Sequence, residues 1–343
     1  MTGDIIAPDA SLAGAYGIAP MTMVKEEITS PLRAARLLAR APPSLADSGE
    51  RSKDWKYALF LGPSVVLICC VMIYPLGYAL YSSLFNYDLG SGIHEFIGLD
   101  NYATLFTEAR FWSALGRTCL IVTCAVTSEF FIGLFVAYGL YLLVRGGRAL
   151  SLLMFLPHIV TPVVAALFLR WIFMGRWGLL SSLLISFNIF PPDWLGDPSW
   201  ARFTVVVADI WQFTPFMILV LLAALNTVDE CLLEAAKLDG AGHWTLLFRI
   251  MVPSVWPMIA FVLVIRVMDA FRSFDNIYVL TAGGPGTATE TLTMYTYTTA
   301  FKLLKIGKAS ALGVLTLLFV GIVAAVVITV LSRMSRGRGK SVI

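Results

Sequence analysis

The sequence predicts an all-α membrane protein with six transmembrane helices and a cytoplasmic loop of short helices between the fourth and the fifth. Hydrophobic residues make up 58% of the 343 residues and charged residues 14%. Soluble domains average roughly 45–50% apolar and 25% charged residues, so this composition indicates a membrane protein. Six apolar runs are long enough to cross a bilayer, because a spanning helix needs about 17–25 residues.

The charges beside these runs predict an orientation. The runs lie at residues 57–84, 118–144, 149–174, 203–227, 255–278 and 309–332. Positive charges lie before the first run, between the second and third, between the fourth and fifth, and after the last. Because cytoplasmic segments carry an excess of Lys and Arg, both termini and the loop between the fourth and fifth spans are expected in the cytoplasm. Lys302, Lys305 and Lys308 favour the opposite orientation, but fewer connections agree with it.

The same pattern divides the chain into three segments. Residues 1–54 contain no apolar run of spanning length and predict a largely disordered cytoplasmic tail. Within this tail, residues 32–40 also fit a short basic amphipathic helix on an anionic membrane surface, and the sequence leaves that alternative open. Residues 55–335 form the six-span domain, and residues 336–343 form a basic cytoplasmic tail. No signal peptide is evident, so we expect the first span to act as an uncleaved anchor.

The segment at about residues 228–253, between the fourth and fifth runs, carries a spaced motif. It consists of Glu234-Ala235-Ala236, three residues, Gly240, nine residues, Ile250, two residues and Pro253. This spacing resembles the coupling-loop signature of permease subunits of binding-protein-dependent ABC importers. The continuation Asp239-Gly240-Ala241-Gly242 resembles the variant in carbohydrate permeases of the maltose and glycerol-phosphate type.

Local physics supports two short helices in this loop. Residues 234–238 are good helix formers, and Gly240 and Gly242 supply the backbone freedom that ends a helix and turns the chain. Leu246, Leu247 and Ile250 give the second helix an apolar face, which we expect to fit a groove of another protein. The resemblance implies that the loop docks in a cleft of a cytosolic ATPase. The implied coupling residues are Glu234, Ala235, Ala236, Asp239, Gly240 and Ala241.

The order of weaker motifs extends the resemblance over residues 55 to 335. These motifs are residues 96–102, Leu156-Pro157, residues 194–198 and residues 280–285. The family implies a type I permease that forms half of a translocation pore in the bacterial inner membrane. Its implied partners are a second homologous permease, two copies of an ABC ATPase, an extracytoplasmic solute-binding protein, a carbohydrate and membrane lipid. ATP and Mg are expected on the partner ATPase, because Gly339-Lys340-Ser341 lacks the earlier glycine of a P-loop and no cofactor is expected in this chain.

Polar residues in the fourth run are candidates for a substrate path. Such residues are costly inside a bilayer and usually face a bundle interior or an aqueous path. Asp209, Gln212 and Phe213 share one helical face. Hydrogen-bonding groups beside an aromatic ring suit a polyhydroxylated solute. The alternative is that Asp209 and Gln212 have a purely structural role.

The fifth run carries alternating charges at intervals of three residues. Arg266, Asp269, Arg272 and Asp275 are candidates for the same path. They also fit two internal pairs, Arg266 with Asp269 and Arg272 with Asp275, that would neutralise each other without touching substrate. Glu129 in the second run fits a buried partner of one arginine. The arginines leave an anionic sugar open, so the sequence does not decide between neutral and anionic substrates.

Other functional classes fit the sequence less well. A secondary, ion-coupled transporter of a polar solute is the alternative, but no matching broken segments in two halves indicate an inverted repeat. An enzyme is not expected, because the three histidines are scattered and no nucleophile motif is present. The five cysteines have no metal-binding or disulfide spacing, and a net charge of +3 gives no reason to expect nucleic acid as a partner.

Overall fold

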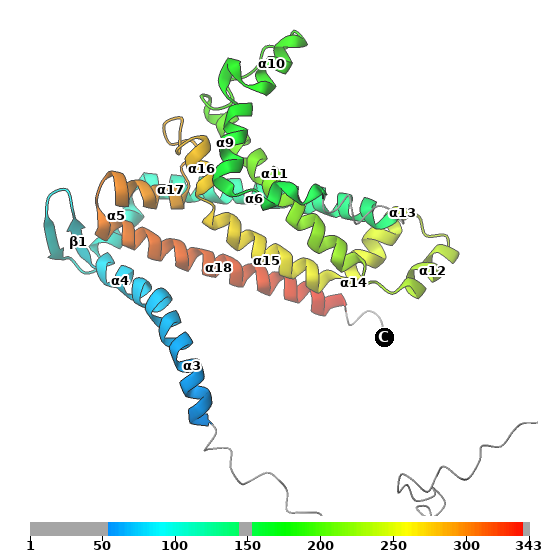
Figure 1. The fold of residues 1–343 in the computed structure, drawn as a ribbon, viewed down its shortest axis with the longest axis horizontal. Coiled ribbons are helices and arrows are strands. Elements are labelled where there is room, and N and C mark those ends of the chain that lie inside the picture. The colour runs from blue at the N-terminus through cyan, green and yellow to red at the C-terminus, as the bar shows by residue number, and fades with distance from the viewer. Residues whose placement is uncertain (1–53, 144–152, 339–343) are drawn as a thin grey trace, which may run out of the picture. The chain divides into compact units, whose positions relative to one another are not determined.

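The structure is a computed structural model that describes residues 54–143 and 153–338 (Figure 1). The chain divides into two units, Met1–Met72 and Ile73–Ile343, and each is described by itself. The expected disordered tail, the possible helix at residues 32–40 and the last five residues lie outside the described residues. So does the start of the predicted third span.

The described part of the first unit is helical and apolar. Helix α3 (Asp54–Ile68) contains Pro63 and continues into the π-helical turn η2 (Cys69–Ile73). Its described side chains are exposed within the structure, including Phe60 and Leu67. Because the segment Leu59–Ser83 has a mean hydropathy of 2.3, it is apolar enough to cross a membrane.

The second unit consists of helices and one short hairpin. Its longer elements are α4 (Tyr74–Ser83), β1 (Phe85–Asp88), β2 (Ile93–Phe96), α5 (Asp100–Thr107), α6 (Ala109–Leu142), α9 (Pro162–Ile172), α10 (Leu179–Ser186), α11 (Pro198–Leu225), α12 (Glu230–Leu238), α15 (Trp256–Arg272) and α18 (Ile306–Arg338). Shorter elements are α8 (Leu156–Ile159), η3 (Gly175–Trp177), α13 (His243–Thr245), η4 (Leu246–Met251), α14 (Val252–Ser254), α16 (Asp275–Leu280), α17 (Leu292–Tyr297) and η5 (Thr298–Lys302). In Figure 1, α6, α11, α15 and α18 form the body of this unit.

Four single helices in the described part are long and apolar enough to span a membrane. They are Leu59–Ser83, Ala109–Leu142, Pro198–Leu225 and Ile306–Arg333. The helix pair His243–Ser254 and Trp256–Arg272 passes the same test together and is bent by 76°. The four single helices agree with four of the predicted spans, and Trp256–Arg272 lies within the predicted fifth span.

The predicted third span is broken where the structure describes it. Only α8 and the 11-residue α9 represent it. Val160 and Thr161 between them are extended, with ψ angles of 132° and 143°. Pro162 favours the break at Thr161, because proline cannot donate its backbone N–H and forces the preceding residue out of the helical region.

Two glycines allow close packing in the second unit. A Cβ atom on Gly133 of α6 would lie 2.8 Å from Cγ of Met217 on α11, so these helices approach closely. A Cβ atom on Gly307 would lie 2.0 Å from the carbonyl oxygen of Phe85, so the start of α18 packs on strand β1. The two-stranded hairpin, in which Phe85 pairs with Phe96, was not predicted from the sequence.

The unit has two distinct ends. We call the end formed by α12, α13, η4 and α14 the α12 end, and the end formed by β1, β2, α5, α17 and the start of α18 the hairpin end (Figure 1). Near the α12 end, Leu134, Met217, Leu247 and Ile259 are buried together and join α6, α11, η4 and α15. This apolar cluster fixes the base from which α12 extends.

Candidate functional site

A buried cluster of charges joins three long helices. Nε of Arg266 on α15 lies 2.6 Å from Oε2 of Glu129 on α6, and its Nη2 donates to Oε1 of Glu129 at 2.9 Å. The same Nη2 donates to Oδ2 of Asp209 on α11. Arg266 is 1% exposed and Glu129 0%. Because a buried guanidinium is costly without partners, these two carboxyl groups hold α15 against α6 and α11.

This cluster decides between the pairings that the sequence left open. Glu129 is the buried partner of an arginine, as one alternative held. Asp269 lies 3.9 Å from Nη1 of Arg266 and its side chain is half exposed, so the predicted pair within α15 is the weaker one. Among the described residues, no ion pair joins Arg272 to Asp275, so the structure does not form the second of the two possible pairs. The local spacing was right for a pair, but the chain extends away from α15 after Arg272.

An amide pair lies beside the charge cluster. Nδ2 of Asn276 on α16 donates to Oε1 of Gln212 on α11 at 2.8 Å. Nε2 of Gln212 donates to the carbonyl oxygen of Val160 at 3.4 Å, next to the break before α9. Within the described part of the chain, Oδ1 of Asn276 is buried and has no hydrogen-bond partner. Gln212 and Asn276 therefore connect three elements and leave one acceptor unused.

A cavity of about 280 Å³ opens where α15 ends. It is lined by Pro162, Phe213, Asp269, Arg272, Ser273, Phe274, Asp275 and Asn276. Ser273 is extended, with φ −58° and ψ 118°, and this break separates α15 from α16. The cavity has carboxylates, a guanidinium, a hydroxyl, an amide and two aromatic rings in its wall.

The cavity contains part of the predicted substrate path. Phe213, Asp269 and Arg272 line it. Arg266 lies behind this wall, with Cζ 4.0 Å from the ring centroid of Phe213, and does not line the cavity. Asp209 and Gln212 are also buried and hold other side chains in place. The structure thus separates the predicted residues into three that line the cavity and three that support its wall.

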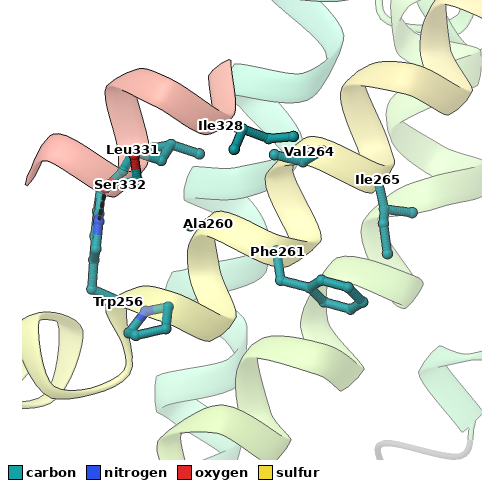
Figure 2. Close-up of a pocket in the computed structure, with 9 residues that line it drawn as sticks. Trp256, Ala260, Phe261, Val264, Ile265, Ile328, Leu331 and Ser332 are labelled. Atoms are coloured by element: carbon teal, nitrogen blue, oxygen red, sulfur yellow. Dashed lines mark hydrogen bonds between the residues drawn. The ribbon is translucent and has the colours of Figure 1, made fainter. Parts of the chain in front are cut away.

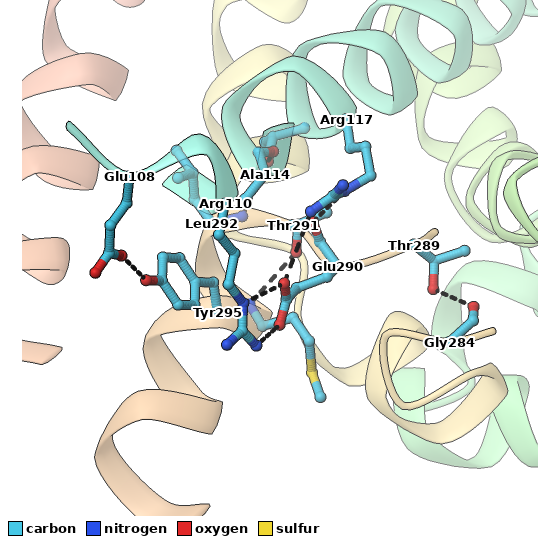
Figure 3. Close-up of polar contacts among 12 residues, drawn as sticks. Glu108, Arg110, Ala114, Arg117, Gly284, Thr289, Glu290, Thr291, Leu292 and Tyr295 are labelled. Carbon is cyan, nitrogen blue, oxygen red and sulfur yellow. Dashed lines mark hydrogen bonds and ion pairs between the residues drawn. The ribbon is translucent and has the colours of Figure 1, made fainter. Parts of the chain in front are cut away.

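A second network of charges lies at the hairpin end (Figure 3). Arg110, near the start of α6, donates to both carboxylate oxygens of Glu290, at 2.6 and 3.0 Å. Nε of Arg117 donates to the carbonyl oxygen of Glu290 at 2.9 Å. The backbone N–H of Leu292 donates to Oγ1 of Thr118 at 3.0 Å. These contacts fasten the segment before α17 to the first turns of α6.

Glu108 extends this network to the start of α18. It accepts hydrogen bonds from Lys308 and from the hydroxyl of Tyr295, the latter at 2.6 Å. Partial burial raises the pKa of Glu108, but the bonds from Lys308 and Tyr295 outweigh it, so the pKa lies below its usual value. Burial and the acceptor Glu108 raise the pKa of Tyr295. The sequence did not indicate this network, whose partners lie more than 170 residues apart.

The α12 end presents the spaced motif on its surface. Asp229 caps α12 by accepting a hydrogen bond from the N–H of Cys231 at 2.9 Å. Leu233 is the buried side chain of this helix. Glu234 and Ala235 are exposed, and Gly240 has φ +83° in the turn after the helix. Figure 1 shows α12 at the extremity of the unit.

The expected second short helix differs from the prediction. Residues 243–254 form one helical stretch through α13, η4 and α14. Leu246 and Leu247 are 5% and 0% exposed and pack in the core of this chain. The expectation that they fit a groove of another protein is therefore wrong, because the 76° bend after Ser254 folds their face back onto α6 and α11. The side chain of Trp244 and those of Glu234 and Ala235 on α12 remain accessible.

Comparison with known proteins places this geometry in a family. Residues 129–337 match the family model described as "Binding-protein-dependent transport system inner membrane component". The chain belongs to this family. It is an inner-membrane permease with several membrane-spanning helices, which confirms the resemblance seen in the sequence.

Relatives of the permease have names that refer to carbohydrates. It is 34% identical over 257 residues to the sulfoquinovosyl glycerol transport system permease protein SmoG of Agrobacterium fabrum, covering 75% of this chain and 83% of SmoG. It is 35% identical over 283 residues to the trehalose transport system permease protein SugA of Mycobacterium tuberculosis, and the match covers 82% of this chain and 90% of SugA. It is 35% identical over 279 residues to the sn-glycerol-3-phosphate transport system permease protein UgpA of Escherichia coli, and the match covers 80% of this chain and 92% of UgpA.

A solved structure confirms the fold of the permease. A chain of a bacterial alginate ABC transporter, crystallised in complex with an alginate pentasaccharide-bound periplasmic protein, matches with a TM-score of 0.70. The two chains are 24% identical, and the match covers 83% of the permease and 95% of that chain. The predicted type I permease fold is confirmed.

Another hollow in the permease has different chemistry. A groove of about 550 Å³ lies between α15 and α18 and is lined by Trp256, Phe261, Val264, Ile328, Leu331 and four further residues (Figure 2). Nε1 of Trp256 donates to the carbonyl oxygen of Leu331 at 3.1 Å. Most of its wall is aliphatic or aromatic, so it lacks the polar groups that bind a sugar. This groove is not a candidate for the substrate path.

Proposed function

We propose that this permease is one half of the pore of an ATP-driven importer that takes up a carbohydrate delivered by an extracytoplasmic binding protein. The other half is a second homologous permease, and two copies of an ABC ATPase bind ATP and Mg and hydrolyse the nucleotide. The observation that carries this proposal is the 34–35% identity, along most of the chain, to permeases named for sulfoquinovosyl glycerol, trehalose and glycerol phosphate. The permease itself carries no catalytic step.

The α12 end is the proposed contact with the ATPase. Glu234, Ala235, Asp239 and Gly240 are exposed there, whereas Leu233 anchors the helix from below. A short helix that is fixed to a rigid apolar cluster can transmit a displacement to α11 and α15, because both helices contribute residues to that cluster. Closure of the ATPase on nucleotide would thus rock the long helices and open the pore alternately to either side.

The proposed orientation puts the α12 end and both termini in the cytoplasm. The positive charges between the fourth and fifth spans support this orientation. The cavity where α15 ends, with Phe213, Asp269 and Arg272 in its wall, would then lie on the path of a sugar from the extracytoplasmic side.

The test is affinity purification of the tagged permease from its native membrane in mild detergent, followed by mass spectrometry and an ATP-dependent uptake assay. The proposal predicts recovery of an ABC ATPase and a second permease, and uptake that stops without ATP. Recovery of the chain alone, with uptake driven by an ion gradient, would instead establish a secondary transporter.

A further inference from the structure

We propose that the cavity lined by Phe213, Asp269, Arg272, Phe274 and Asn276 is a subsite for an uncharged sugar and disfavours sugars that bear a phosphate, sulfonate or carboxylate. The inference rests on the proposed function and names the substrate class of the site. The sequence left this question open, because two arginines in the fifth run fitted an anionic ligand equally well.

Arg266 is not available to an anion in the cavity. Its Nε and Nη2 atoms bind Glu129 and Asp209, and its side chain is 1% exposed. One carboxylate is enough to balance a guanidinium, and here two are present. The only remaining nitrogen, Nη1, is buried and makes no hydrogen bond among the described residues, but the carboxylate of Asp269 lies 3.9 Å from it and adds further negative charge. A phosphate in the cavity would therefore meet no uncompensated charge from Arg266.

The charges that line the cavity are unbalanced toward the negative side. Asp269 and Asp275 lie three residues before and after Arg272, and all three line the wall. Two carboxylates thus face one guanidinium. Strong recognition of phosphate or sulfonate in proteins relies on cations in excess, usually with bidentate hydrogen bonds. This wall has the opposite balance and repels an anion.

The remaining wall of the cavity suits a neutral sugar. Phe213 and Phe274 supply aromatic rings for the C–H faces of a sugar, and the carboxylates of Asp269 and Asp275 accept hydrogen bonds from hydroxyl groups. Asn276 is 4% exposed and its Oδ1 atom has no partner among the described residues. An unused buried acceptor beside the cavity is costly unless something donates to it. A sugar hydroxyl is a donor of the right kind.

The experiment places a thiol in the cavity and measures the local charge directly. Ser273→Cys is introduced into the assembled importer after Cys69, Cys70, Cys119, Cys124 and Cys231 are replaced by Ser. Rates of modification by a cationic and an anionic methanethiosulfonate reagent are each divided by their rates with a free thiol. One net negative charge about 7 Å away changes each rate by about threefold at water-like dielectric. We expect the cationic reagent to be favoured by at least that factor.

The matched control is Thr296→Cys. Thr296 lines a neighbouring cavity of about 320 Å³ that shares Phe274 with the first one but has no charged residue in its wall. At Thr296→Cys, the modification rates of the two reagents, each divided by its rate with a free thiol, should be equal. A preference for the anionic reagent at Ser273→Cys, or the same cationic preference at both positions, would overturn the assignment of charge to this cavity.

Protection by sugars tests the ligand. Neutral trehalose, maltose or sucrose should slow modification of Ser273→Cys, and sn-glycerol 3-phosphate at the same concentration should not. Protection by glycerol phosphate, or by no neutral sugar, would overturn the subsite. ATP-driven uptake is measured in the same preparations with a panel of neutral and anionic sugars. Loss of uptake for every sugar would contradict the proposed function, whereas uptake of anionic sugars alone would contradict only this inference.

Discussion

The two ends of the second unit are held together by different forces. At the hairpin end, charged and polar side chains from distant segments bind one another, as Glu290 does with Arg110 and Arg117. At the α12 end, Leu247 and Ile259 pack in an apolar cluster, and the motif-bearing helix is left exposed. The buried cluster around Arg266 lies between them. The comparison indicates that polar contacts hold the helices in register near the cavity, while the α12 end is built to present a surface.

Removing the central arginine should have the largest effect. Arg266→Met leaves Glu129 and Asp209 buried without a cation, and breaking a buried pair in this way costs about 3–5 kcal/mol. Thermal unfolding of the purified protein in detergent measures the loss, with exposed Arg272→Met as the control on the same helix. A shift no larger than that of Arg272→Met would show that the cluster does not hold the helices together.

The turn after α12 should be the next most sensitive position. Gly240→Val forces a β-branched residue to φ +83°, a strain of about 1–2 kcal/mol that displaces the turn. We expect normal insertion into the membrane but at least about tenfold slower ATP-driven uptake, since about 1.4 kcal/mol corresponds to tenfold. Gly242→Ala is the matched control, because Gly242 has φ −75° and no atom within 4 Å of an added Cβ. Equal rates of uptake by Gly240→Val and Gly242→Ala would show that the turn at Gly240 is not needed for ATP-driven transport.

The Glu108 network should give a smaller and pH-dependent effect. Its folded pKa is below the usual value of 4.5, so the carboxylate stabilises the fold above pH 4.5, and this stabilisation is lost as the pH falls through the folded pKa. Because the side chain is 30% exposed, we expect Glu108→Gln to cost up to about 1 kcal/mol at pH 7. Unfolding curves of both proteins should converge below pH 4.5. A difference that grows in acid would contradict the network.

Replacing the half-exposed carboxylate of Asp269 should have the smallest effect on stability. Asp269 lies 3.9 Å from Arg266 and its side chain is half exposed, so Asp269→Asn should change stability by less than about 0.5 kcal/mol. Asp209→Asn is the comparison and should cost several times more, because it weakens a buried charge-assisted hydrogen bond to the same guanidinium even though Glu129 still balances its charge. Unfolding midpoints measure both. Equal losses would place Asp269 in the supporting cluster and not in the cavity wall.

Features that depend on a few neighbouring residues could be predicted from the sequence, and contacts between distant segments could not. The α12 helix and its glycine turn were predictable, because helix formers and glycines act over a few residues of sequence. The charge pairs were predictable only as a set of candidates, because the spacing on α15 does not reveal which of Asp209, Glu129 and Asp269 approaches Arg266. The break at Ser273 has no proline or glycine beside it, and so the roles of Phe274 and Asn276 in the cavity gave no signal.

Two expectations depended on the path of the chain. Leu246 and Leu247 were assigned to a partner because the loop was expected to protrude, whereas the chain bends by 76° after Ser254 and both side chains are buried. The possible pair of Arg272 with Asp275 was drawn within one continuous helix, whereas the helix ends before Ser273. A helical pattern gives the face of a side chain but not the path of the helix that carries it.

The most direct test of the account is a cross-link between α12 and the ATPase. Ala235→Cys, exposed on α12, is combined in the cysteine-free background with single cysteines in the cleft of the co-purified ATPase. We expect a disulfide whose yield changes when ATP is added, and no disulfide from a cysteine that replaces exposed Ser199 at the start of α11. Absence of a cross-link from Ala235→Cys in an assembly that still imports sugar would contradict the role of α12 as the coupling helix.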